Sequence, residues 1–229
     1  MRYNPDKHHR RSIRLKDYNY RQEGAYFVTV CTQGRLCLFG DVVDDIMVLN
    51  DAGKSIEQTF KGLPTYCFGL EIDEYIVMPN HVHVVFVLTR NDVGAGLRAC
   101  PMSSNFKIEN ERIDEGHLSD QGHPSDKGQA RRPAPTDEGR TTLSDVVYRF
   151  KSWTTKLYSD GVKQTGWEAF PGRLWQRNYY EHIIRNDDEL NRIREYINGN
   201  PQNWATDEEN PANISANKKL EQRRIAPHS

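Results

Sequence analysis

The sequence has few cysteines, and those it has follow no metal-binding or disulfide pattern. Cys31, Cys37, Cys67 and Cys100 show no C-x-x-C spacing, which marks zinc ribbons and thiol redox sites. Four thiols in 229 residues are also too sparse for the disulfide framework of a small secreted domain. We therefore expect reduced cysteines and a cytoplasmic protein.

Long apolar runs, a large net charge and a glycine-rich phosphate loop are also missing. No stretch approaches the roughly 20 apolar residues that span a membrane, and the basic N-terminus lacks the apolar centre of a signal peptide. The sequence contains no phosphate-binding loop, so nothing in it predicts a nucleotide cofactor. The formal net charge is −1 at pH 7, so overall charge does not indicate a nucleic-acid-binding protein. We expect a soluble chain with no membrane contact and no nucleotide cofactor.

Charge and composition divide the chain into four parts. Residues 1–24 carry seven Lys and Arg against three acidic residues; this basic arm would attract a polyanion, although a solvated tail is the alternative. Residues 90–140 are rich in Gly, Pro, Ser and charge, which predicts a flexible insertion. The other two parts are a folded domain, at 25–89 plus 141–204, and a polar tail at 205–229.

Hydrophobic periodicity predicts alternating strands and helices in the folded domain. Strand composition is found at 25–32, 68–78, 81–88 and 174–184. Helical spacing of apolar residues is found at 48–63, 141–158 and 186–200. This order predicts an α+β fold, best matched by a ferredoxin-like antiparallel sheet with helices packed on it, all on one side.

The segment VMPNHVHVVFVL (77–88) places two histidines at the start of a predicted strand. Side chains two residues apart on a strand point to the same face, so His81 and His83 project together. Two neutral imidazoles side by side can share one divalent ion. The alternative is an ordinary pair of partly exposed histidines on the open face of the sheet.

A metal site needs further ligands, and the last predicted helix offers Tyr196 and Asn200. They are four residues apart and therefore stack on one helix face, beside the apolar stripe of Leu190, Ile193 and Ile197. Each alone has a simpler explanation, because a helical tyrosine is commonly a packing residue and an asparagine before proline ends a helix. Only the combination with the histidine pair indicates a site.

Three segments together resemble the single-tyrosine HUH transposases (His, hydrophobic, His), above all the REP-associated tyrosine transposases. They are RRSIRLKDYNYRQEGAYFVTVCTQGRLCLFG, YIVMPNHVHVVFVL and LWQRNYYEHIIRNDDELNRIREYINGNPQNW. The resemblance covers about 10–89 and 141–204. It implies a fold of the HUH endonuclease type, cleavage and rejoining of single-stranded DNA through a 5′-phosphotyrosine link, and recognition of short palindromic repeats folded as hairpins.

The resemblance also implies roles for four residues. Carried over one by one, His81 and His83 match the metal-binding pair, Tyr196 the nucleophile and Asn200 the amide ligand. Two imidazoles, one amide oxygen and DNA phosphate oxygens suit Mg²⁺ or Mn²⁺. The predicted function is a metal-dependent transposase that nicks and rejoins single-stranded DNA. The alternative is a catalytically idle DNA-hairpin-binding module of the same fold.

Two other tyrosines in the last predicted strand, Tyr179 and Tyr180, compete as the nucleophile, and His182 is nearby as a possible ligand. Tyr180 and His182 share a strand face, but neither has an amide partner at helical spacing, so we favour Tyr196 and expect Tyr180 to pack or to stack on DNA. The expected partner is single-stranded DNA with hairpin repeats, bound by a monomer or a homodimer. The candidate DNA-binding residues are Arg10, Arg11, Arg14, Lys16, Lys151, Arg177 and Tyr180.

Overall fold

The computed structural model describes residues 23–89 and 141–213. The chain divides into one compact unit, formed by 1–94 and 140–229, and another formed by 95–139. The second unit lies wholly outside the described residues. So do nearly all of the predicted basic arm and insertion, including Arg10, Arg11, Arg14 and Lys16, and their roles stay predictions.

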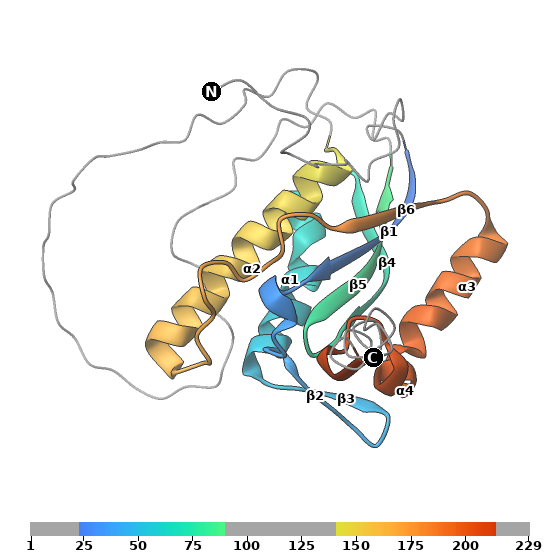
Figure 1. Cartoon of the computed structure of the whole chain (residues 1–229). Coiled ribbons are helices and arrows are strands. Elements are labelled where there is room, and N and C mark those ends of the chain that lie inside the picture. Colours follow the sequence, from blue (N-terminus) through green and yellow to red (C-terminus); the bar gives the residue numbers. More distant parts are fainter. Residues whose placement is uncertain (1–22, 90–140, 214–229) are drawn as a thin grey trace, which may run out of the picture. The chain divides into compact units, whose positions relative to one another are not determined.

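A four-stranded antiparallel sheet forms the centre of the described unit (Figure 1). Its spatial order is β4 (Leu70–Val77), β5 (His81–Leu88), β1 (Gly24–Cys31) and β6 (Tyr180–Ile184), and each neighbouring pair is antiparallel. Helix α1 (Asp51–Tyr66) precedes β4, and α2 (Leu143–Thr165) precedes β6. The order β1-α1-β4-β5-α2-β6 with β1 and β5 central is the ferredoxin-like arrangement. The predicted fold class is confirmed.

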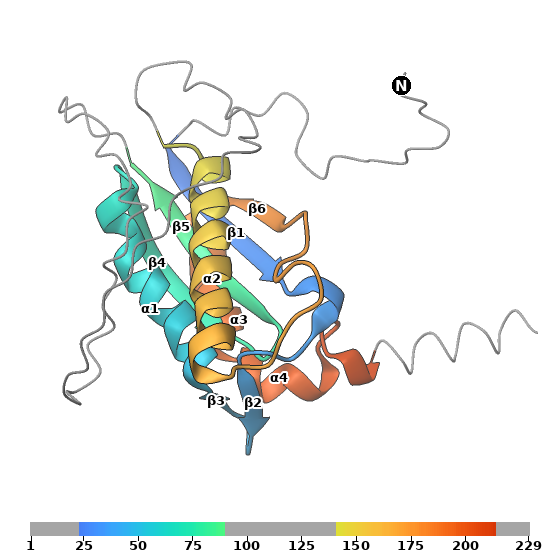
Figure 2. The same ribbon diagram turned by 90° about the vertical axis from the view of Figure 1, so that its left-hand side faces the viewer.

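The two faces of the sheet carry separate cores. Even-numbered residues of β1 and β5 pack against α1 and α2, where Phe60 and Phe150 stack with ring centroids 4.6 Å apart. Odd-numbered residues of the same strands face α3 (Asp187–Asn198), whose Ile197 packs with Phe27. Figures 1 and 2 show α1 and α2 on one side of the sheet and α3 on the other. The prediction of helices on one side is therefore wrong, because the apolar stripe of α3 buries itself on the second face.

A two-stranded hairpin precedes α1 and was missed in the sequence. Within the described part of the chain, strands β2 (Gly40–Val43) and β3 (Ile46–Leu49) pair only with each other. Their outward-facing Val43, Ile46 and Val48 are all more than half exposed. A half-buried strand is detected in a sequence by its alternation of apolar and polar residues. These strands carry apolar residues on both faces and lack that alternation, which is why the hairpin was missed.

The elements near the C-terminus are shorter than predicted. The strand expected at 174–184 begins only at Tyr180, because Trp175 makes an isolated bridge with Thr32 instead. Helix α3 stops at Asn198, and the short helix α4 (Asn200–Asn203) follows it. No helix among the residues described is both long and apolar enough to cross a membrane.

Candidate active site at the histidine pair

The two histidines of β5 meet on the face of the sheet that α3 covers. His81 and His83 are 0% and 3% exposed, so they are not the partly exposed pair of the alternative interpretation. Their Nε2 atoms lie 3.0 Å apart, with the rings inclined at 67°. The two nitrogens therefore converge on one point that a single ion can reach.

Asn80 determines how the ring of His81 is presented. The Asn80 amide nitrogen donates to the carbonyls of Glu209 (2.8 Å) and Arg35 (3.1 Å), so its Oδ1 must face the other way, toward His81 Nδ1 at 2.9 Å. Since Oδ1 only accepts, His81 carries its proton on Nδ1. The lone pair of a neutral His81 is consequently on Nε2, directed at His83.

Thr29 plays the corresponding part for His83. It lies opposite His83 in the β1–β5 register, and its hydroxyl is 2.8 Å from Nδ1. A hydroxyl both donates and accepts. His83 can therefore donate an Nε2 proton to His81, or it can donate from Nδ1 to Thr29 and present a second lone pair at the shared point.

Burial keeps both imidazoles neutral. It lowers the pKa of His81 to about 4, and it holds the pKa of His83 well below its usual range, with the neighbouring His81 adding to the effect. Metal ligation requires the neutral imidazole. At neutral pH no proton competes with a cation for these nitrogens.

The C-terminal helices bring Tyr196 and Asn200 to the same place. The Tyr196 hydroxyl lies 3.4 Å from His83 Nε2, and its ring stands edge-on to Phe27 at 5.9 Å. Burial raises the pKa of Tyr196, and the side chain of Asn200 partly offsets this. Asn200 is buried, and its Oδ1 has no hydrogen-bond partner among the residues that the structure describes. The four residues that the sequence grouped are thus gathered in one site.

Asp207 completes a cluster that the sequence analysis missed. One ligand atom each of His81, His83 and Asp207 lie within 4.8 Å of one another. The sequence placed residue 207 in a polar tail beginning at 205, whereas residues 205–213 are described here and Glu209 forms an ion pair of 2.6 Å with Arg35. The acidic run at 207–209 was the available signal, but no local spacing connects it with the histidines.

We expect Asn80→Ala to weaken Mn²⁺ binding by about 10- to 100-fold, because His81 loses the group that orients its ring. The unpaired buried groups should also lower the free energy of unfolding by about 1–3 kcal/mol. Calorimetric titration with Mn²⁺ and chemical denaturation measure the two effects. The exposed Asn178→Ala is the control and should change neither; an unaltered Mn²⁺ affinity in Asn80→Ala would contradict the orienting role.

Tyr180 and His182 lie beside the site but take part in other contacts. Tyr180 is 55% exposed and meets Phe27 edge-on, with ring centroids 6.3 Å apart. His182 Nε2 donates to Glu189 Oε1 at 2.7 Å. Tyr196 contacts His83, whereas Tyr180 makes no contact with the histidine pair within the described part of the chain.

Lys151 lies on α2, and Arg177 lies on the segment that leads into β6. The Lys151 ammonium donates to the carbonyls of Gln176 (2.9 Å) and Asn178 (3.0 Å), and burial lowers its pKa to about 8. Lys151 therefore holds this segment in place and is not a free donor for DNA. The side chain of Arg177 is exposed, so a DNA contact there stays a prediction.

Comparison with known proteins finds a relative in sequence and several similar solved structures. An uncharacterized protein of Haemophilus influenzae is 34% identical over 207 residues, which are 90% of this chain and 96% of that protein. The chain belongs to the same family as this protein. No family model matches the sequence.

Two of the similar solved structures are described as transposases. A REP-associated tyrosine transposase bound to a REP hairpin matches with a TM-score of 0.44 and 16% identity over 82% of this chain and 73% of that one. A Deinococcus radiodurans R1 protein provisionally named a transposase matches with a TM-score of 0.37 and 16% identity, over 82% of this chain and 96% of that one.

Proposed function

We propose that the protein is a metal-dependent transposase that nicks and rejoins single-stranded DNA at hairpin-forming repeats, through a covalent link between Tyr196 and a 5′-phosphate. The convergence of His81 Nε2, His83 Nε2 and the Tyr196 hydroxyl in one site is the observation that carries the proposal. The sequence segments that resemble the REP-associated tyrosine transposases supply the substrate class.

The donor set suits a divalent ion of the Mg²⁺ or Mn²⁺ type. His81 and His83 offer two neutral nitrogens, Asp207 a carboxylate, and Asn200 a buried amide oxygen that nothing else in the described structure satisfies. The imidazole nitrogens make such a mixed nitrogen and oxygen ligand set bind Mn²⁺ more tightly than Mg²⁺. When bound, the ion would polarise the scissile phosphate and neutralise charge that develops on its oxygens.

Tyr196 supplies the nucleophile. Its phenolic oxygen forms a bond to phosphorus while the bond from phosphorus to the 3′-oxygen breaks; the phenol loses a proton and the departing oxygen gains one, leaving a 3′-hydroxyl. The ring is half exposed, at 48%, so DNA and water can both reach it. Attack by a 3′-hydroxyl reverses the step, since the tyrosyl ester conserves the phosphodiester bond energy.

The acidic segment 207–209 opposes this chemistry until a cation is present. Asp207, Glu209 and Glu208 all add to the effect of burial in raising the pKa of Tyr196. A tyrosine with a raised pKa is a poor nucleophile at neutral pH. A cation held by Asp207 and the histidines would reverse the sign of the local field.

We expect Asp207→Asn to weaken Mn²⁺ binding by about tenfold or more, because a charged ligand becomes neutral. In the metal-free protein the same substitution should lower the pKa of Tyr196, because a nearby negative charge is lost. Calorimetry follows the first effect and ultraviolet titration of phenolate the second. Glu208→Gln is the matched control, with a small effect on both; equal effects of the two substitutions would contradict the ligand role.

The proposed function is tested by mixing the full chain with 3′-end-labelled single strands that carry hairpins, in the presence of Mn²⁺, because the 3′ part of the strand stays on the protein. We expect a labelled band at the combined mass of protein and DNA in denaturing electrophoresis. Retarded migration in a native gel without any covalent band would overturn the enzymatic proposal and indicate a hairpin-binding module.

A further inference from the structure

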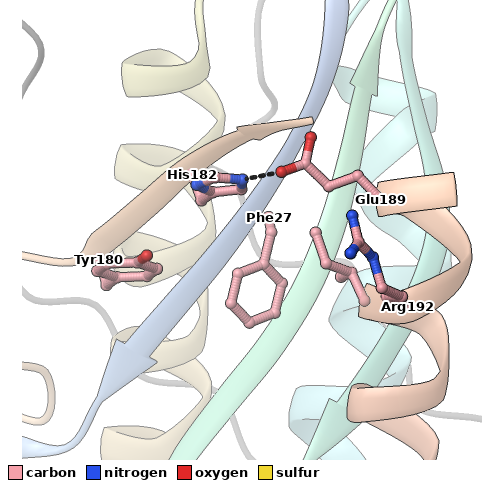
Figure 3. Close-up of a pocket in the computed structure, with 6 residues that line it drawn as sticks. Phe27, Tyr180, His182, Glu189 and Arg192 are labelled. Carbon is pink, nitrogen blue, oxygen red and sulfur yellow. Dashed lines mark hydrogen bonds and ion pairs between the residues drawn. The ribbon is translucent and has the colours of Figure 1, made fainter. Parts of the chain in front are cut away.

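A pocket of about 320 Å³ opens beside the candidate active site. Figure 3 shows its lining, which comes from β1, β6 and α3 and consists of Phe27, Tyr180, His182, Glu189, Arg192 and Ile193. Neither the metal-binding residues proposed above nor Tyr196 belongs to this lining. The chemistry of cleavage therefore leaves the pocket without a role.

Phe27 is the wall shared by the pocket and the active site. Its ring stacks on His83 with centroids 5.3 Å apart and an interplanar angle of 25°. The same ring meets Tyr196 edge-on, and on the pocket side it meets Tyr180. A group held in the pocket is thus separated from the reacting atoms by a single aromatic ring.

The shape and lining of the pocket suit one planar aromatic ligand. Its volume is at the lower end of the range for small-molecule sites. The Tyr180 ring is 55% exposed, and its contact with Phe27 is inclined at 69°, so no ring lies parallel against it. An exposed aromatic ring beside a proposed DNA site is the usual platform for stacking an unpaired base.

The charges of the pocket favour a neutral ligand over a phosphate group. Glu189 accepts hydrogen bonds from the Arg185 backbone N–H (2.8 Å) and from His182 (2.7 Å), and these hold the pKa of its carboxyl below the usual range. The negative charge of Glu189 offsets the positive charge of Arg192, so the lining has no net positive charge to attract a phosphate. Arg192 is exposed, and no hydrogen bond or ion pair joins its guanidinium to another residue of 23–89 or 141–213, so its donors are available to a ligand.

We propose that this pocket holds one unpaired nucleobase, guanine by preference, next to the phosphate that Tyr196 attacks, and thereby selects the position of cleavage. The inference rests on the proposed function and adds a specificity element to it. Stacking on Tyr180 accepts any base. Arg192 adds the preference, because arginine donates two parallel hydrogen bonds to O6 and N7 of guanine, and such a pair discriminates by about 5- to 100-fold.

The test uses a single strand that carries one hairpin with four randomised nucleotides on each side. The full chain and its variants are incubated with this library and Mn²⁺, and both the covalently captured strands and the released fragments that end in a 3′-hydroxyl are sequenced. We expect the unmodified chain to enrich guanine at least about fivefold at one randomised position. Tyr180→Ala and Arg192→Ala should lose enrichment at that position and keep whatever preference exists elsewhere.

Three further variants separate base recognition from other roles. Tyr180→Phe keeps the stacking ring and should keep the enrichment. Arg192→Lys keeps the charge but loses the paired donors, so it should lose the enrichment. If the enrichment is retained, Arg192 acts only through its charge, and the proposed reading of guanine by paired hydrogen bonds is overturned. Lys163→Ala removes an exposed cation of α2, on the opposite face of the sheet, and should behave as the unmodified chain does.

The library also separates failure of this inference from failure of the proposed function. If the unmodified chain captures strands but Tyr180→Ala and Arg192→Ala leave every preference intact, the pocket does not read a base. If no strand is captured covalently, the proposed function fails. The strands of the same library that bind the Tyr196→Phe variant are then isolated from the retarded band of a native gel and sequenced. If the double variant Tyr196→Phe/Arg192→Ala loses the base preference of Tyr196→Phe, the pocket is supported as a base-binding element. If the preference is unchanged, the base-binding role of the pocket is overturned.

Discussion

Tyr196→Phe should abolish the covalent protein–DNA product, lowering its rate of formation by at least about 10³-fold, because only the nucleophilic oxygen is removed. The ring remains to pack against Phe27. Folding should therefore be nearly unchanged, since the contact of the hydroxyl with His83 is long, at 3.4 Å, and affinity for hairpin strands should stay within about threefold. Denaturing electrophoresis measures the product, and native gel retardation measures binding.

Tyr180→Phe is the matched control for this experiment. It removes the hydroxyl of a tyrosine on β6 that is similarly exposed, and it should leave the rate of product formation almost unchanged. Should Tyr180→Phe abolish the product while Tyr196→Phe leaves it intact, the nucleophile is Tyr180 and the assignment made here is wrong.

His81→Ala and His83→Ala should each reduce Mn²⁺ affinity by at least about 100-fold and abolish cleavage. Each removes one of the two Nε2 atoms that lie 3.0 Å apart and that would bind the ion as neutral imidazoles. Calorimetric titration measures the affinity. Each substitution also leaves a buried partner unpaired, Asn80 in one case and Thr29 in the other. A loss of about 1–3 kcal/mol of stability is therefore expected, and the assays belong at temperatures where circular dichroism shows folded protein.

His182→Ala provides the control for metal binding. His182 is hydrogen-bonded to Glu189 and lies outside the cluster of His81, His83 and Asp207, so its removal should leave Mn²⁺ affinity unchanged. Cleavage by the unmodified chain should also cease in excess EDTA. Robust cleavage under that condition would contradict a metal-dependent mechanism.

The sequence by itself determined the local geometry of the site. The two-residue period of a strand placed His81 and His83 on one face before any contact was known. The 3.6-residue period of a helix placed Tyr196 above Asn200. The fold class followed from the order of such segments. These features depend on neighbours within one or two turns of chain, which is why periodicity alone could predict them.

Only the tertiary structure decided what surrounds those residues. It placed α3 on the second face of the sheet, Asp207 within reach of the histidine pair, and Phe27 between that pair and the pocket. The contacts responsible join residues far apart in the chain: Asn80 and Glu209 are 129 positions apart, and His83 and Tyr196 are 113. No periodic pattern records such contacts, because they depend on which apolar face remains uncovered once the strands and helices have packed together.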